Sequence, residues 1–104
     1  DMGMFDDLII DSKYLPDKLK GHIGGWQTKS YGSLFHVLVI SETGRLLETT
    51  GLKNDTRVLK ETNYTGEIRF YDEISGVWVE FNASFVDGQM VDLVQISPLS
   101  EADL

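Results

Sequence analysis

The chain has 104 residues, of which 41% are hydrophobic and 11% aromatic, and its formal net charge is −8. This length and composition predict one folded domain over residues 1–104 and argue against a disordered chain. The absence of cysteine excludes disulfides and thiolate metal sites, the scarcity of basic residues disfavours direct binding to duplex nucleic acid, and no apolar run approaches the ~18 residues that a membrane-spanning helix needs.

The N-terminal third predicts one strand and then a long loop. The short apolar run over residues 4–11 predicts a first strand. Residues 12–33 are rich in glycine and lysine, which predicts a loop region. Within this region Leu15-Pro16 interrupts regular structure, residues 17–20 suffice for one helical turn, and residues 26–29 predict a short strand.

The middle of the chain predicts a hairpin followed by an irregular segment. Residues 34–40 form a nearly continuous apolar run rich in β-branched side chains, which predicts a central strand buried on both faces. The turn residues 41–44 separate this run from residues 45–50, its expected partner strand. The following polar segment contains one candidate for a short strand or turn, at residues 57–60.

The last third carries the strongest strand signals. Residues 67–71 alternate between apolar and polar side chains, and residues 77–85 do so without interruption. Asp87-Gly88 predicts a type I′ turn, because both central residues of that turn need positive φ. Residues 90–96 form the final expected strand, and a proline then begins an acidic tail over residues 98–104. The alternation predicts that the core face of the longest strand consists of Val77, Val79, Phe81, Ala83 and Phe85.

These elements together predict an all-β fold. Three turn signals, at residues 41–44, 72–76 and 86–89, each separate two apolar or alternating runs. We therefore expect a single small antiparallel sheet of five to seven hairpin-connected strands, arranged as a curled sheet or a partly open barrel.

The first half of the chain contains four short motifs, Met2-Gly3-Met4-Phe5-Asp6-Asp7, Leu15-Pro16, Trp26-Gln27-Thr28-Lys29 and Glu42-Thr43-Gly44-Arg45-Leu46. As a set, these motifs resemble those of a group of small bacteriophage proteins. The proteins that the chain resembles begin Met-Gly-Met-Phe-Asp and carry Gln-Thr-Lys after a glycine-rich loop. The resemblance covers roughly residues 2–47. It implies a viral source and a small accessory role, and it gives no catalytic residue to carry over.

The residues typical of catalysis do not gather into a recognisable pattern. His22 and His36 have no histidine or cysteine at metal-ligand spacing, and no serine lies in a Gly-x-Ser-x-Gly elbow. We therefore expect no cofactor, and the sequence favours a binding protein over an enzyme.

The glycine-rich loop keeps one ligand site open as an alternative. Its glycines expose backbone N–H groups, and Lys20, Lys29 and Trp26 supply charge and a stacking face that suit a phosphate or a base. The competing interpretation is that Trp26 is a core residue packed over the sheet.

Two surfaces are candidates for binding a macromolecule. The first is an aromatic pair ringed by polar groups, an arrangement typical of interface hot spots, unless a second layer covers the rings. It consists of Tyr71, Trp78, Glu80 and Arg69. The second is an acidic strand edge that either steers a basic partner or only discourages edge-to-edge aggregation. It consists of Asp6, Asp7 and Asp11.

We therefore hypothesise a non-enzymatic bacteriophage accessory protein that binds a host protein in the cytoplasm of an infected bacterium. The alternative is a small-ligand or nucleotide-binding protein, or an enzyme, that uses the Lys20–Trp26 loop. Self-association through an unpaired edge strand is a further alternative. Of the two protein-binding surfaces the aromatic one is favoured, because acidic edges are also an ordinary protection against aggregation.

Overall fold

The computed structural model describes residues 6–31, 37–50 and 58–104. The described residues contain three 3-10 turns and no helix long and apolar enough to cross a membrane. The turns are η1 (Ser12–Tyr14), η2 (Asp17–Leu19) and η4 (Glu101–Asp103). The strands are β1 (Asp6–Ile10), β2 (Trp26–Thr28), β3 (Val37–Ile40), β4 (Leu46–Thr50), β5 (Val58–Glu61), β6 (Gly66–Ile74), β7 (Val77–Val86) and β8 (Gln89–Ser97).

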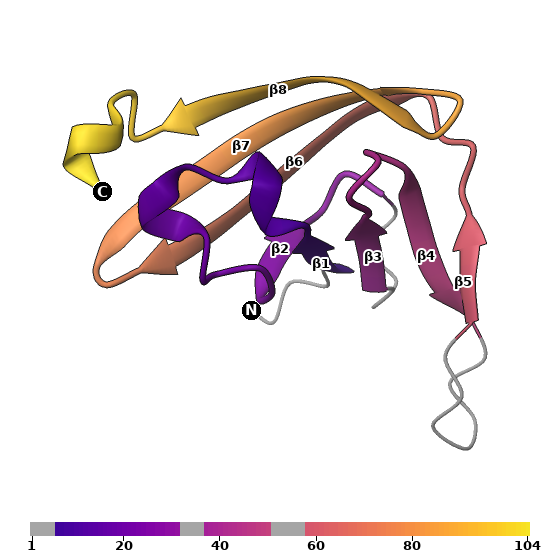
Figure 1. Ribbon diagram of the computed structural model, residues 1–104, viewed down its shortest axis with the longest axis horizontal. Coiled ribbons are helices and arrows are strands. Elements are labelled where there is room, and N and C mark those ends of the chain that lie inside the picture. Colours follow the sequence, from indigo (N-terminus) through magenta and orange to yellow (C-terminus); the bar gives the residue numbers. More distant parts are fainter. Residues whose placement is uncertain (1–5, 32–36, 51–57) are drawn as a thin grey trace.

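The eight strands form one open sheet in the order β5-β4-β3-β1-β2-β6-β7-β8 (Figure 1). The predicted all-β class and single sheet are confirmed. The sheet has more strands than the five to seven expected, because β2 and β5 are too short to give a strong alternation signal. The expectation of purely antiparallel pairing is wrong for one pair, because β1 and β3 run parallel. The chain reverses direction from β1 to β2 and again from β2 to β3, and β3 then pairs with the free side of β1.

The hairpins of the C-terminal half are built on the predicted turn chemistry. Asp87 and Gly88 have φ of 48° and 83°, and Ser75 and Gly76 have φ of 51° and 81°. Positive φ at both central residues is the type I′ pattern, whose twist matches that of the flanking strands. These turns set the register of β6, β7 and β8.

The sheet curls until two of its hairpin turns meet. The Met90 N–H donates to the Gly44 carbonyl at 2.8 Å, and the Leu46 N–H donates to the Gly88 carbonyl at 2.8 Å. The β3–β4 turn is therefore joined to the β7–β8 turn by backbone hydrogen bonds, while β5 and β8 remain the two ends of the strand order. The expected curled sheet or partly open barrel is confirmed.

The core lies on the inner face of this curl. The alternation predicted for β7 is confirmed, with Val79, Phe81, Ala83 and Phe85 buried and Val77 half-buried at the end of the strand. Leucines from the η1 and η2 segments pack against the same core. Its other buried hydrophobic members are Leu8, Ile10, Leu15, Leu19, Trp26, Leu38, Ile40, Leu46, Ile68 and Phe70.

One burial prediction is wrong. The strand β3 was expected to be buried on both faces, but Leu38 and Ile40 are buried while Val37 and Val39 are half-buried. The single curled sheet covers only its inner side, so the outer side chains of β3 keep contact with solvent. The opening motif Met2–Phe5, the histidine His36 and the start of the 57–60 segment lie outside the described residues.

Candidate functional site

The predicted aromatic surface exists on the outer face of β6 and β7. Tyr71 pairs with Glu80 across the two strands, and Trp78 pairs with Glu73. Side chains alternate along a strand, so Tyr71 and Trp78 point away from the core, whereas their neighbours Phe70 and Val79 point into it. We call Arg69, Tyr71, Trp78 and Glu80 the Trp78 surface.

The members of the Trp78 surface hold one another in place. The rings of Tyr71 and Trp78 are stacked, with centroids 5.1 Å apart and an interplanar angle of 22°. The Trp78 Nε1–H donates to Glu80 Oε1 at 3.1 Å, and Arg69 Nη1 donates to Glu80 Oε2 at 3.4 Å. Trp78 nevertheless remains 48% exposed. The alternative that a second layer covers the rings is therefore wrong, and the indole is both ordered and accessible.

The outer face of β6 and β7 also carries two polar side chains, Tyr71 and Asn82. Partial burial, and next the negative charge of Glu80, raise the pKa of the Tyr71 phenol above its ordinary value. A phenol is neutral at physiological pH even at its ordinary pKa, so the Tyr71 hydroxyl acts as both a donor and an acceptor. On β7, the Asn82 side-chain oxygen is shielded from solvent and has no hydrogen-bond partner among the described residues. A shielded acceptor without a donor carries a cost of about 1–3 kcal/mol.

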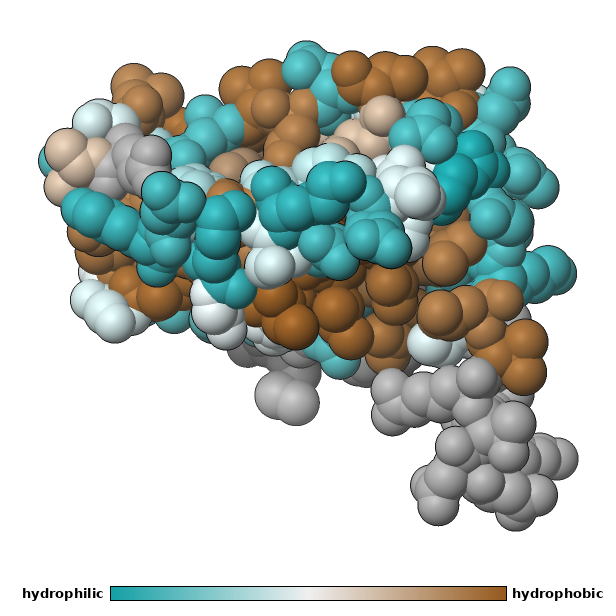
Figure 2. Space-filling model, in the orientation of Figure 1, coloured by the Kyte–Doolittle hydropathy of each residue, from teal (hydrophilic) through white to brown (hydrophobic). Residues whose placement is uncertain are grey.

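Exposed valines on β8 extend the apolar character beyond the two rings, which the sequence did not indicate. Val94 lies opposite Asn82 and is 48% exposed, and Val91 is 61% exposed. Figure 2 shows hydrophobic surface gathered along the upper rim of the molecule, over β8. Two irregularities in the β7–β8 register break the alternation of β8, so its exposed side chains cannot be read from the sequence pattern.

The glycine-rich loop lacks the stacking face that the ligand-site alternative assigned to Trp26. Trp26 is fully buried, so its ring is a core residue and offers no stacking face to a ligand. The Lys20 ammonium donates to the carbonyls of Ser12 and Leu15 at 3.1 and 3.0 Å, which ties the loop to itself. Lys29 is exposed, but it is not free, because it already interacts with another part of the chain. Of the two interpretations of the loop, the core alternative for Trp26 is correct.

A polar chain that the sequence did not reveal fixes this loop to the sheet. The Trp26 Nε1–H donates to the His22 carbonyl at 2.9 Å, and the two rings make an edge contact at 5.1 Å. His22 Nε2 lies 2.8 Å from Asp72 Oδ2 on β6. Fifty positions separate His22 and Asp72 in the chain, so no local motif could have indicated the pair.

The three N-terminal acids do not form an acidic edge. β1 lies between β3 and β2 in the interior of the sheet, so the prediction that it is an edge is wrong. Asp6 is fully buried, Asp7 is exposed, and Asp11 accepts a hydrogen bond from the Lys13 N–H at the start of η1. Three environments in sequence on one central strand and its end give no common surface for a basic partner.

The described residues contain no group of three or more His, Cys, Asp or Glu side chains placed to hold a metal ion. Comparisons of the chain with protein-family models, with curated proteins and with solved structures gave no match.

Proposed function

We propose that the protein is a non-enzymatic binding protein that contacts a protein partner through the Trp78 surface. The observation that carries this proposal is the combination of exposure and order at Trp78. The ring is 48% exposed, yet it is stacked on Tyr71 and hydrogen-bonded to Glu80. A large ring that is already fixed loses little conformational freedom on binding, so the burial of its surface translates into affinity.

The composition of the surface also supports a protein partner. Tryptophan, tyrosine and arginine are the residues most enriched at interface hot spots, and all three are present within one patch of two strands. The neighbouring exposed Val94 adds apolar area beside this patch. The two competing surfaces lose support, because Trp26 is buried and the acids of β1 are dispersed.

The nature of the partner rests on the resemblance of residues 2–47 to small bacteriophage proteins. A viral accessory protein without catalytic groups acts by contacting host components, so the proposed partner is a host protein in the cytoplasm of an infected bacterium. Self-association through β5 or β8, the two ends of the strand order, is the rival use of an exposed surface.

The test uses two alanine variants of exposed apolar residues on distant strands, β7 and β5. The wild type, Trp78→Ala and Leu59→Ala are each used for affinity capture from bacterial lysate, and the captured protein is then purified and titrated. We expect Trp78→Ala to weaken binding at least tenfold, through faster dissociation. The affinity of the wild type for its partner should change little with added salt, because the contact is mainly apolar. Leu59 is 50% exposed on β5, so Leu59→Ala should bind as the wild type does.

Three results would overturn the proposal. Unchanged partner binding by folded Trp78→Ala would exclude the Trp78 surface. Loss of binding on neutralising Asp7 and Asp11, together with steep salt sensitivity, would transfer the function to the acids. Concentration-dependent sedimentation of the wild type that Trp78→Ala abolishes would identify the partner as a second copy of this chain.

A further inference from the structure

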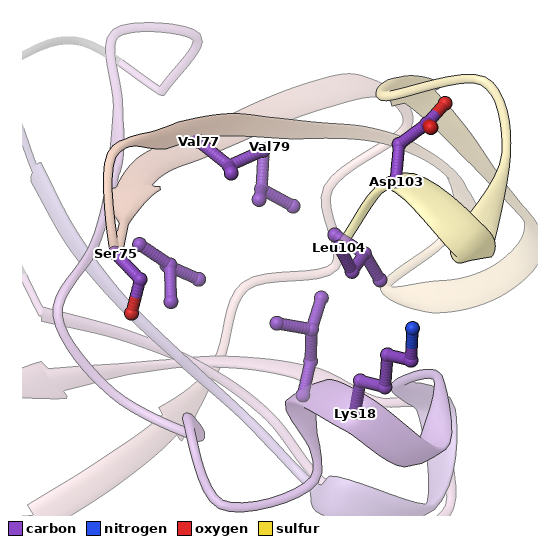
Figure 3. Close-up of a pocket in the computed structure, with 8 residues that line it drawn as sticks. Lys18, Ser75, Val77, Val79, Asp103 and Leu104 are labelled. Atoms are coloured by element: carbon purple, nitrogen blue, oxygen red, sulfur yellow. The ribbon is translucent and has the colours of Figure 1, made fainter.

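A cavity of about 420 Å³ lies on the inner side of the sheet, between η2, the β6–β7 turn and the C-terminal turn η4 (Figure 3). Its walls are mainly aliphatic, and its polar lining residues are few. The aliphatic members are Leu19, Ile74, Val77, Val79 and Leu104. Trp78 lies between the two valines on β7 and points to the opposite face, so this cavity is separate from the Trp78 surface.

The cavity has one cation at its rim. Lys18 lies on η2, is exposed, and makes no ion pair or hydrogen bond with the other described side chains. Figure 3 shows the Lys18 side chain extending toward Leu104, whereas the carboxylate of Asp103 points away from the lining valines. The lysine charge is therefore available to a bound molecule, and the aspartate is turned from it.

We propose that this cavity binds an aliphatic carboxylate, with its hydrocarbon tail against the half-buried Ile74, Val77 and Leu104 and its carboxylate at Lys18. An apolar cavity of a few hundred Å³ with one or two convergent polar groups is the usual form of a small-molecule site. The walls supply the affinity by burying methylene groups, at about 0.8 kcal/mol for each one buried. Lys18 determines which head group is preferred, because its ammonium group attracts a carboxylate and repels an alkylammonium ion.

The proposal selects among molecules that have the same tail. An alcohol has the tail without the charge, and an alkyl ammonium ion has the tail with the wrong charge. The overall acidity of the protein disfavours any anion at long range. A preference for the carboxylate would therefore have to come from Lys18 itself, at short range.

The experiment titrates wild-type protein with octanoate, octan-1-ol and octylammonium, with calorimetry for affinity and amide NMR shifts for location. We expect saturable binding of octanoate, with the largest shifts around Leu19, Val77 and Leu104, and weaker binding of the other two probes. Lys18→Met should reduce octanoate affinity about fivefold, the size of a partly exposed ion pair, and leave octanol binding unchanged. Lys60→Met, on exposed β5, is the matched control and should bind octanoate as the wild type does.

A second variant tests the cavity independently of the charge. Val77→Phe should fill the cavity and abolish binding of all three probes, while circular dichroism reports whether the sheet is retained. Absence of saturable octanoate binding by the wild type would overturn the proposal, as would an unchanged preference for octanoate in Lys18→Met. Trp78→Ala should bind octanoate normally, so a failure here is distinguishable from a failure of the proposed protein-binding function.

Discussion

The two tryptophans of this chain differ in every aspect of their environment except hydrogen bonding. Trp26 on β2 is fully buried, and Trp78 on β7 is 48% exposed, although only β6 separates their strands. Both indole N–H groups have an acceptor within 3.1 Å, the His22 carbonyl for Trp26 and the Glu80 carboxylate for Trp78. The difference therefore lies in what surrounds the rings.

Trp26 stands at the centre of an aromatic cluster on the inner face. Its ring makes edge contacts with Phe70 at 5.3 Å and Phe81 at 5.7 Å, and those two rings are stacked on each other. Among the described residues Trp78 has one aromatic neighbour, Tyr71, and its ring is 48% exposed on the outer face of the sheet. The comparison shows that one indole is used to hold three strands together, whereas the other is held in order by its neighbours and remains free to contact a partner.

The largest expected effect is the loss of Trp26. Trp26→Ala would leave a large cavity and remove the donor of the partly buried His22 carbonyl, so we expect a loss at the upper end of about 3–5 kcal/mol in the free energy of unfolding. Trp78→Ala should cost about 1 kcal/mol, the value of one aromatic stack near solvent. Urea denaturation of both variants measures the difference, and equal losses would show that the two rings contribute alike to the fold.

A pair of adjacent residues on β7 tests the same inside–outside difference without tryptophan. Phe81 is buried and Glu80 faces outward, where it accepts hydrogen bonds from Trp78 and Arg69. Phe81→Ala should cost about 3–5 kcal/mol, whereas Glu80→Ala should cost about 1 kcal/mol, the usual net value of the hydrogen bonding that it loses. Similar denaturation midpoints for these two variants would mean that the assigned register of β7 is wrong.

The sequence was sufficient for the C-terminal half because its signals are local. The period of two along β7 placed Phe81 inside and Trp78 outside, and the Asp87-Gly88 turn fixed the pairing of β7 with the first residues of β8, before the two irregularities that the sequence did not reveal. The four residues of the Trp78 surface follow from that alternation, since outward positions of paired strands become neighbours.

The N-terminal half depends on long-range contacts that no local pattern contains. The insertion of β1 between β2 and β3 made an expected edge into a central strand and buried Asp6. The burial of Trp26 follows from contacts with Phe70 and Phe81, more than forty positions away, which the glycine-rich loop around it does not reveal. The cavity near Lys18 likewise arises from three segments that meet only in the folded chain.

Tryptophan fluorescence measures the different solvent exposure of the two indole rings directly. Trp78→Phe leaves Trp26 as the single emitter, and Trp26→Phe leaves Trp78. We expect the Trp26 emission to be blue-shifted and nearly insensitive to acrylamide, because the ring is fully buried. The Trp78 emission should be red-shifted and strongly quenched. Equal quenching in the two variants, at retained sheet content by circular dichroism, would contradict the different exposures.

The smallest effect concerns the phenol stacked on Trp78. Burial, and next the Glu80 charge, raise the pKa of Tyr71 above its ordinary value near 10.0, so folding favours the neutral phenol. A raised pKa contributes stability that is fully present below the pKa of the unfolded chain and is lost as pH rises through that of the folded protein. Tyr71→Phe should remove one late-titrating phenol from the alkaline absorbance titration and reduce the fall in stability above pH ~10.

Tyr31, whose pKa is also raised, first by burial and then by Glu48, should titrate late in both proteins and serves as the internal control. If Tyr71→Phe leaves the titration curve unchanged except for one phenol of ordinary pKa, the stacked ring is less protected than the structure indicates, and Trp78 would then be ordered mainly by Glu80.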